Sequence, residues 1–247
     1  MQTQKTMLLL GCTSDIGLAT AIAYGNAGYR LIVTARDPVS AERNVRDITT
    51  RTGAEVDLRA LDILRIDHFE SFVDGLPVLP DAVVCVIGEL GDQRRAQRDL
   101  DHASTVMRTN FEGPALLLGL FAERMSERGW GTLVGVSSVA GDRGRASNYA
   151  YGAAKAGFTA FLSGLRNRLA ASRVRVVTIK PGYVHTRMTQ NMKLPSALTA
   201  EPDEVARAVY RATETGRGDV LYVRPIWRII MAVIRAIPER LFKKLRL

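Results

Sequence analysis

The strongest constraint on the fold of this chain is a regular alternation between short apolar runs and longer amphipathic segments. The apolar runs predict strands, and the amphipathic segments predict helices. Continuously apolar strands separated by helices are typical of a parallel sheet that helices cover on both faces. The predicted strands span 6–10, 30–35, 56–61, 81–87, 132–137, 174–179 and 220–223, and the predicted helices span 16–27, 40–51, 66–75, 149–171 and 202–215, with two helical segments within 100–125.

The predicted fold class is therefore α/β, a single Rossmann-type, doubly wound parallel sheet of about seven strands with helices on both faces. A chain of 247 residues, 47% of them hydrophobic, has room for one such domain with a large core. The sequence has no internal repeat or linker, so we assign one domain to residues 1–224 and a tail to residues 225–247. An open sheet of this kind binds ligands at the carboxyl ends of its strands.

Composition narrows the expected location and chemistry of the protein. The two cysteines, Cys12 and Cys85, are too few for a disulfide framework, which is typical of a reducing compartment. They have no metal-ligand spacing with the three histidines, so we expect no metal site. The amino terminus does not resemble a secretory signal, and no apolar stretch approaches the ~18–20 residues of a membrane span. We expect a cytoplasmic protein that contacts the inner face of a membrane at most peripherally.

The positive charge is concentrated in the tail. The whole chain has 34 basic and 25 acidic residues, a formal charge of +9, and residues 225–247 contain six basic residues and one acidic residue, a net charge of +5. This asymmetry favours an anionic partner for the tail. Nucleic acid is not expected, because no recognition motif accompanies the charge.

The pattern of the tail leaves two interpretations open. Residues 226–237 are apolar apart from two arginines seven positions apart, Pro238 interrupts them, and residues 239–247 combine apolar and basic side chains. An apolar face with Trp227 and a basic face is typical of a helix that lies on anionic lipid. A helix docked on its own domain or on a partner subunit explains the same pattern. A helix that covers a hydrophobic substrate entrance would satisfy both.

A glycine-containing turn separates the first predicted strand from the first predicted helix. Gly11 permits a tight turn, Gly17 permits close packing of helix on strand, and the helix amino terminus offers free amides to a pyrophosphate. A plain turn is the alternative. The residues expected to line a dinucleotide here are Gly11, Thr13, Ser14, Asp15, Ile16 and Gly17.

Charged residues at the next strand ends bear on the choice of dinucleotide. Arg36 follows the second strand, where an arginine would hold the 2′-phosphate of NADP, whereas a carboxylate would hold the ribose of NAD. NADP is our prediction and NAD the alternative; a solvated Arg36 beside Asp37 is the structural explanation. Asp62 and Ile63, after the third strand, are expected to contact adenine, although Asp62 also suits a helix cap.

The candidate catalytic residues lie beside the later strands. Tyr151 and Lys155 are four residues apart on a predicted helix, hence on one face. An ammonium beside a phenol lowers the phenol's pKa from about 10, which would make Tyr151 a general acid–base. Ser138 ends the preceding strand and reaches the same region, and Asn110 within a helix would bind a backbone group or a water. Taken singly, each residue also has a plain structural explanation.

Together these residues resemble the short-chain dehydrogenase/reductase family over residues 5–224. The matching motifs are Ser138 with Tyr151-x-x-x-Lys155, Asn110-x-x-Gly113, and Pro181-Gly182 followed by Thr186. The resemblance implies that Tyr151 protonates a substrate carbonyl oxygen and Ser138 hydrogen-bonds it, while Lys155 holds the nicotinamide ribose and lowers the Tyr151 pKa. It also implies that Asn110 positions a water. It assigns cofactor contacts to Gly88, Asn110, Tyr151, Lys155, Pro181, Gly182, Val184 and Thr186.

Two departures from the family pattern concern the adenosine side. Leu10 and Asp15 replace a threonine and a glycine of the nucleotide loop, and Cys85-Val86-Ile87-Gly88 replaces an Asn-Asn-Ala-Gly segment. The loop, a Gly88-x-x-Gly91-Asp92 segment and the basic tail are similar to a narrower group, the decaprenylphosphoryl-2-keto-erythro-pentose reductases, which act on a lipid-linked keto-sugar.

The predicted function is NAD(P)H-dependent reduction of a ketone, such as a lipid-linked keto-sugar, to a secondary alcohol. The alternatives are a soluble small-ketone or 3-oxoacyl reductase and a non-catalytic nucleotide-binding scaffold. The resemblance implies a homodimer or homotetramer that forms through the helices around Asn110 and Tyr151. On the substrate side, Arg143, Arg145 and Arg187 are candidates to bind a substrate phosphate, and solvated arginines are the alternative for each.

Overall fold

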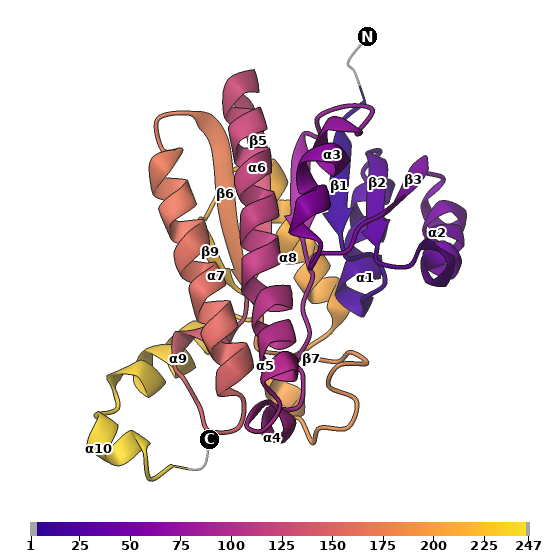
Figure 1. Cartoon of the computed structure of the whole chain (residues 1–247). Helices are drawn as coiled ribbons and strands as arrows, with labels where there is room; N and C mark the ends of the chain where they lie inside the picture. Colours follow the sequence, from indigo (N-terminus) through magenta and orange to yellow (C-terminus); the bar gives the residue numbers. More distant parts are fainter. Residues whose placement is uncertain (1–3, 246–247) are drawn as a thin grey trace.

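A computed structural model describes residues 4–245 of the chain, and its centre is a seven-stranded sheet (Figure 1). All neighbouring strands in this sheet run parallel, in the order β3-β2-β1-β4-β5-β6-β9, which confirms the predicted fold class. The chain builds outward from β1 to β3 and then returns to β4, so the strand order reverses between β1 and β4. The strands are β1 Thr6–Leu10, β2 Arg30–Ala35, β3 Val56–Ala60, β4 Ala82–Cys85, β5 Trp130–Val136, β6 Arg173–Lys180 and β9 Val220–Tyr222.

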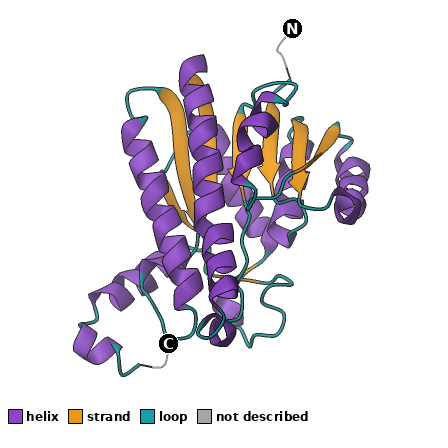
Figure 2. Cartoon of the chain, in the orientation of Figure 1, coloured by secondary structure: helices purple, strands orange, loops and turns teal. Residues whose placement is uncertain are grey.

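Helices cover both faces of the sheet (Figure 2). One layer contains α1 Asp15–Asn26, α2 Pro38–Thr52 and α8 Pro202–Thr215, and the other contains α3 Phe69–Asp74, α5 Leu100–Met107, α6 Gly113–Arg128 and α7 Tyr149–Arg168. The short helix α4 Gln93–Ala96 precedes α5, and a small parallel pair, β7 Tyr183–Val184 with β8 Thr199–Ala200, lies beyond β6.

The core divides by the two-residue period of the strands. In β1, Met7 and Leu9 face α1 and α8, whereas Leu8 and Leu10 face α6 and α7. All four side chains are inaccessible to solvent, because a parallel sheet between two helical layers is buried on both faces. This explains why its central strands are continuously apolar in the sequence.

Element ends differ from the predicted ones by up to three residues at both edges of the sheet, and α7, for example, ends at Arg168 rather than at residue 171. β4 ends at Cys85 rather than residue 87, because its partner β1 ends at Leu10, which lies opposite Cys85. The predicted helix 66–75 is divided into a 3-10 turn, η1 Ile66–His68, and α3. The two helical segments within 100–125 are joined by a π-helical turn, η2 Arg108–Glu112, that includes Asn110.

The tail contains two helices, α9 Ile226–Ala236 and α10 Glu239–Phe242, and the last of its predicted basic residues, Arg246, lies outside the described residues. Trp227 and Met231 on the inner face of α9 are buried against Val139 of the 3-10 turn η3 Val139–Asp142. The structure therefore shows α9 docked on its own domain through this face. The outer face stays exposed, and it includes the apolar side chains Ile226, Ile229, Val233, Leu241 and Leu245.

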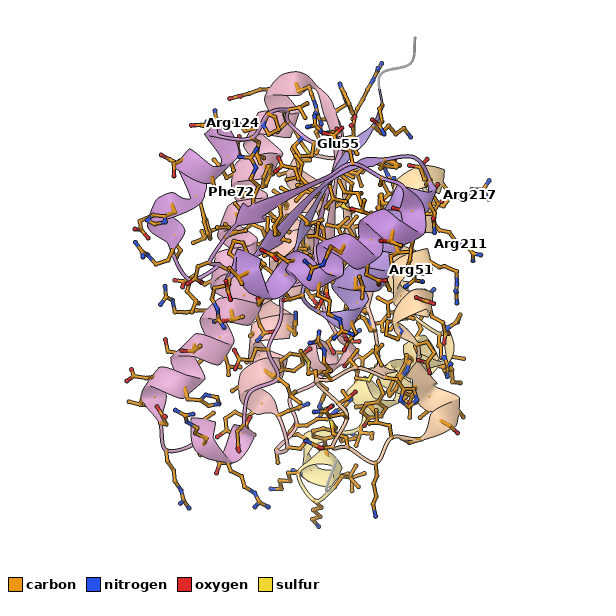
Figure 3. The ribbon with its side chains drawn as sticks, turned by 90° about the vertical axis from the view of Figure 1, so that its right-hand side faces the viewer. Arg51, Glu55, Phe72, Arg124, Arg211 and Arg217 are labelled. Atoms are coloured by element: carbon orange, nitrogen blue, oxygen red, sulfur yellow. The ribbon has the colours of Figure 1, made fainter. Side chains whose placement is uncertain are left out.

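Two further surface properties bear on partners. Within residues 4–245, no helix is long and apolar enough to cross a membrane. Exposed arginines also occur far from the tail. Figure 3 labels three of them, Arg51 at the end of α2, Arg211 on α8 and Arg217 after α8.

Candidate active site

Two adjoining pockets run along the carboxyl ends of the strands, where the fold predicts a ligand. We call them the catalytic pocket and the adenosine-side pocket. They share the wall formed by Val86 and Gly88, immediately after β4. The catalytic pocket is lined by Ile16, Ser138, Tyr151, Lys155, Pro181, Gly182, Val184 and Thr186, and the adenosine-side pocket by Gly11, Thr13, Ser14, Arg36, Asp62 and Ile63. The structure thus brings together almost all of the predicted site residues.

The glycine turn at the start of α1 is as tight as predicted. Gly11 has φ +101°, and a Cβ atom on Gly17 would lie 2.3 Å from the Gly11 carbonyl oxygen, so both positions require glycine. Ser14 caps the helix: its hydroxyl accepts from the Gly17 amide at 3.0 Å and donates to the Gly11 carbonyl at 3.1 Å. Asp15 and Gly17 do not line either pocket, so their effect on a ligand is indirect.

The charged residues that follow β2 and β3 take different positions at the adenosine-side pocket. Arg36 is exposed at the pocket wall. Asp37 points elsewhere, because its carboxylate caps α2 by accepting from the Val39 amide at 3.1 Å. Asp62 lines the pocket and also accepts from the Leu64 amide at 3.0 Å, but it caps no helix, since the turn η1 begins only at Ile66 and its N-cap residue is Arg65.

Close packing of η3 on α7 places Ser138 beside Tyr151. A Cβ atom on Gly141 would lie 2.7 Å from the backbone of α7, and one on Gly152 would lie 3.0 Å from the Ala140 carbonyl. Ser137, just before η3, donates from its hydroxyl to the Lys155 carbonyl at 3.0 Å. In the sequence, the visible signals of this support were Gly141, close after the serine pair, and Gly152 on the helix of Tyr151.

The electrostatics of Tyr151 differ from the expectation. Burial raises the pKa of Tyr151 above its ordinary value, and its hydrogen bond with Ser138 opposes that rise. The net shift of this pKa is therefore upward rather than downward as predicted, although the Lys155 ammonium, which donates to the carbonyls of Val136 at 3.2 Å and Ile87 at 3.5 Å, lies 5.8 Å from the centroid of the Tyr151 ring. Burial also lowers the pKa of Lys155 itself to about 8. The phenol therefore remains protonated near neutral pH.

Asn110 lies fully buried in the π-helical turn, a feature that is frequent at functional sites. Its amide nitrogen donates to the carbonyls of Glu89 at 2.6 Å and Val106 at 2.8 Å, and its oxygen accepts from the Glu89 amide at 3.2 Å. The backbone-binding alternative is the one observed for this side chain. Gly88 fits between Asn110 and Lys155, since a Cβ atom there would lie 3.0 Å from Oδ1 and 3.2 Å from Nζ.

Trp227 completes the catalytic pocket, a contact that the sequence alone offered only as a tail helix over a substrate entrance. The ring lies directly against Gly182, where an added Cβ would lie 2.0 Å from the indole, and Nε1 donates to the Leu198 carbonyl at 3.0 Å. The tail therefore forms part of the pocket wall. Composition could not show this contact, because it joins residues far apart in the sequence.

The structure removes two of the three candidate phosphate-binding arginines. Arg143 donates to the carbonyls of Ile234, Arg235 and Ile237 and pairs with Glu239, so it fastens the tail. Arg187 is likewise engaged at the nucleotide turn, where it pairs with the Asp15 carboxylate and donates to the Thr13 carbonyl. Arg145, in contrast, lines the catalytic pocket.

The described geometry agrees with three comparisons. A family model described as short chain dehydrogenase matches residues 5–196. An uncharacterized oxidoreductase of Streptomyces coelicolor is 35% identical over 98% of this chain and 96% of its own length, and one of Mycobacterium tuberculosis is 32% identical over 94% and 98%. A variant of the actinorhodin polyketide ketoreductase with NADPH aligns with a TM-score of 0.80 at 25% identity, over 90% of this chain and 97% of that chain. This chain belongs to the short-chain dehydrogenase family, and it is an oxidoreductase that acts on CH–OH and C=O groups.

Proposed function

We propose that the protein reduces a ketone to a secondary alcohol with NAD(P)H. The observation that supports this most directly is a protonated phenol in a largely apolar pocket: Tyr151 is hydrogen-bonded to Ser138 and its pKa is raised by burial. A general acid must hold its proton until charge develops on the substrate oxygen. Tyr151 meets this requirement at neutral pH.

A nicotinamide dinucleotide fits the two adjoining pockets. The close approach at Gly11 and Gly17 leaves the amino terminus of α1 open to a pyrophosphate, and Gly88 leaves room where the pockets meet. In the catalytic pocket, Pro181, Gly182, Val184 and Thr186 would contact the nicotinamide. When bound, the reduced nicotinamide supplies a hydride. An NADPH-bound ketoreductase and a 3-oxoacyl reductase in complex with NAD are among the similar structures.

The residues of this chain would handle the proton and the carbonyl oxygen. The Tyr151 hydroxyl donates its proton to the oxygen as negative charge develops there, and Ser138 donates a second hydrogen bond that orients the carbonyl. The Lys155 ammonium, held by two backbone carbonyls, provides positive charge behind the phenol and stabilises the phenolate that forms. Asn110 fixes the Glu89 backbone that borders this site.

The substitution Tyr151→Phe tests this assignment. A panel of ketones with NADPH should show turnover by the wild type and a loss of about 10²–10⁴-fold in kcat for the variant, since the phenylalanine lacks the acidic proton. NADPH binding, followed by its fluorescence, should persist in the variant. Turnover that survives Tyr151→Phe would overturn the proposed role, and NADPH binding without turnover of any ketone would support a non-catalytic scaffold.

NADP is the proposed preference, and the exposed position of Arg36 at the adenosine-side pocket supports it. An arginine fork pairs well with a 2′-phosphate, which NADH lacks. Fluorescence titration should therefore give a lower Kd for NADPH than for NADH, and Arg36→Ala should weaken NADPH by about 10-fold with little effect on NADH. An equal loss of affinity for NADPH and NADH in Arg36→Ala would contradict the proposed preference for NADP.

For the substrate, we propose a ketone attached to an apolar group, such as a lipid-linked keto-sugar. Met188, Met192 and Trp227 form an apolar wall of the catalytic pocket, next to Tyr151. A small-ketone or 3-oxoacyl reductase is the second candidate, and 25% identity to a 3-oxoacyl-[acyl-carrier-protein] reductase of Aquifex aeolicus supports it. The ketone panel should include both classes.

Two partners are proposed for the outer surfaces. A second copy of the chain would cover the apolar groove between α6 and α7, which includes Leu116, Leu120 and Phe161, and sedimentation velocity measures this directly. An anionic membrane surface would contact the outer face of the tail, where exposed Ile229 and Val233 lie near basic side chains.

A further inference from the structure

We propose that Arg145 binds an anionic group of the substrate, a phosphate ester or a carboxylate, inside the catalytic pocket. The inference rests on the proposed reductase function and specifies its substrate class. The candidate is a ketone that combines this anion, an apolar extension and a hydroxyl group near Asn148.

The cations nearest the site already have partners, apart from Arg145. Lys155 donates to backbone carbonyls, and Lys180 pairs with the buried carboxylate of Asp142, which also accepts from the Tyr222 hydroxyl at 2.8 Å. Arg143 is bonded to the tail and Arg187 to the nucleotide turn. Both oxygens of Asp142 thus have partners, and its ion pair is with Lys180 rather than with Arg145.

Among residues 4–245, no carboxylate oxygen lies within 4.0 Å of a guanidinium nitrogen of Arg145, so this side chain has no counterion there. Its Nε atom is buried and has no hydrogen-bond partner, and its Nη2 atom contacts the Met231 sulfur at 3.4 Å. A thioether is a weak acceptor. A partly buried guanidinium with an unsatisfied donor is costly unless a ligand supplies an anion.

The same loop presents an unsatisfied acceptor. Asn148 also lines the pocket, and its Oδ1 atom is buried without a partner. An acceptor of this kind is satisfied by a hydroxyl donor. An unpaired donor with positive charge and an unpaired acceptor therefore lie on one loop, between Ser138 and Tyr151, and both face the pocket. A hydroxylated ketone with an anionic substituent complements both atoms.

The location separates this site from the dinucleotide. The predicted 2′-phosphate site at Arg36 belongs to the adenosine-side pocket, and the predicted pyrophosphate site lies at the amino terminus of α1. Arg145 instead lines the same pocket as Ser138, Tyr151 and the apolar side chains that would contact a lipid or acyl chain. We therefore assign the anion to the substrate.

Binding rather than turnover tests the proposal, so that a failure of the reductase assignment does not obscure the result. Isothermal titration calorimetry of the full chain with NADPH present would compare octyl phosphate, octanoate and octan-1-ol, which differ in charge but share an apolar chain. We expect Arg145→Gln to raise the Kd for octyl phosphate, octanoate or both at least 10-fold, and Arg145→Lys to recover part of the loss. Octan-1-ol should be unaffected.

Two controls make the result specific. Arg98→Gln removes the same charge from the exposed surface near α4 and should leave every Kd within about twofold. Asn148→Leu should erase the preference for 1-O-octylglycerol 3-phosphate, which adds a hydroxyl, over octyl phosphate. The proposal is overturned if Arg145→Gln binds both anions as tightly as the wild type does. It is also overturned if Arg98→Gln loses as much anion affinity as Arg145→Gln does, or if Arg145→Gln lowers the affinity for NADPH to the same extent as the affinity for the anions. Absence of NADPH binding in the wild type would instead reject the proposed function.

Discussion

At the scale of single residues, Lys155 couples the site to the stability of the fold. Burial lowers its pKa to about 8, while an unfolded chain has a lysine pKa of about 10.4. Between these values the unfolded chain binds more protons than the folded chain, so the free energy of unfolding must rise with pH. Below pH 8 both states are protonated, and the destabilising effect of the buried ammonium is at its full size.

The corresponding prediction compares the cofactor-free wild type with Lys155→Met. Urea unfolding from pH 8 to pH 10 should show the wild type gaining about 2 kcal/mol relative to the variant, because methionine has no proton to release. Other groups that titrate in this range are common to both proteins and largely cancel in the difference. Parallel stability curves would show that Lys155 does not titrate as its burial implies.

Local patterns were sufficient to find the principal site residues but not their bonding. Tyr151 and Lys155 share a helix face because of their spacing, and the structure confirms that they line one pocket. The direction of the Tyr151 pKa shift was predicted wrongly, since burial of the phenol, which a local pattern does not show, raises that pKa. Similarly, only tertiary contacts distinguish Arg145 from Arg143.

At the scale of elements, the packing of η3 on α7 sets the position of Ser138. A methyl group on Gly141 would lie 2.7 Å from the α7 backbone, which cannot yield as a flexible side chain would. Gly141→Ala should therefore lower the free energy of unfolding by about 1–3 kcal/mol and, by moving Ser138, reduce kcat at least 10-fold. Urea titration and ketone kinetics measure the two effects.

The same loop offers a matched control for this prediction. Gly144 is three residues away, and an added Cβ there meets no atom within 4 Å. Gly144→Ala should thus leave both unfolding and kcat near the wild-type values. Equal behaviour of the two variants would mean that contact with α7 does not position the serine.

The elements themselves were largely predictable because hydrophobic period is a local property. The predicted bounds of β1, β2 and α8 agree with the structure. The end of β4 and the π-helical turn at Asn110 were not predicted. The end of a strand depends on its partner strand, and the π-helical turn is accompanied by a side-chain hydrogen bond from Asn110 to the Glu89 backbone. Both differences from the prediction lie near the pockets, where tertiary contacts at the carboxyl edge of the sheet override the local hydrophobic pattern.

At the scale of the whole molecule, the sequence did not decide how the tail and the domain are joined. Trp227 reaches the catalytic pocket against Gly182, and Arg143 binds carbonyls at the end of α9 while its guanidinium lies 4.0 Å from the Phe242 ring centroid. The tail is thus bonded to the loop that holds Arg145 and Asn148. In Figure 1, α9 lies beside one end of α7, and its residue Trp227 lines the catalytic pocket.

A membrane-linked substrate would reach this pocket most directly if the outer face of the tail rested on lipid, and vesicle flotation tests that contact. Ile229, Val233 and Leu241 are 63%, 61% and 58% exposed, so changing all three to serine removes apolar area without disturbing the core. The full chain should float with vesicles that contain phosphatidylglycerol and separate from them in high salt, because exposed basic side chains attract anionic lipid. The triple variant should bind at least 10-fold less, given about 1.5–3 kcal/mol for each fully buried side chain. Leu100→Ser, at an 82% exposed position on α5, is the control and should float normally. Flotation of the triple variant to the wild-type extent would exclude the tail as the contact.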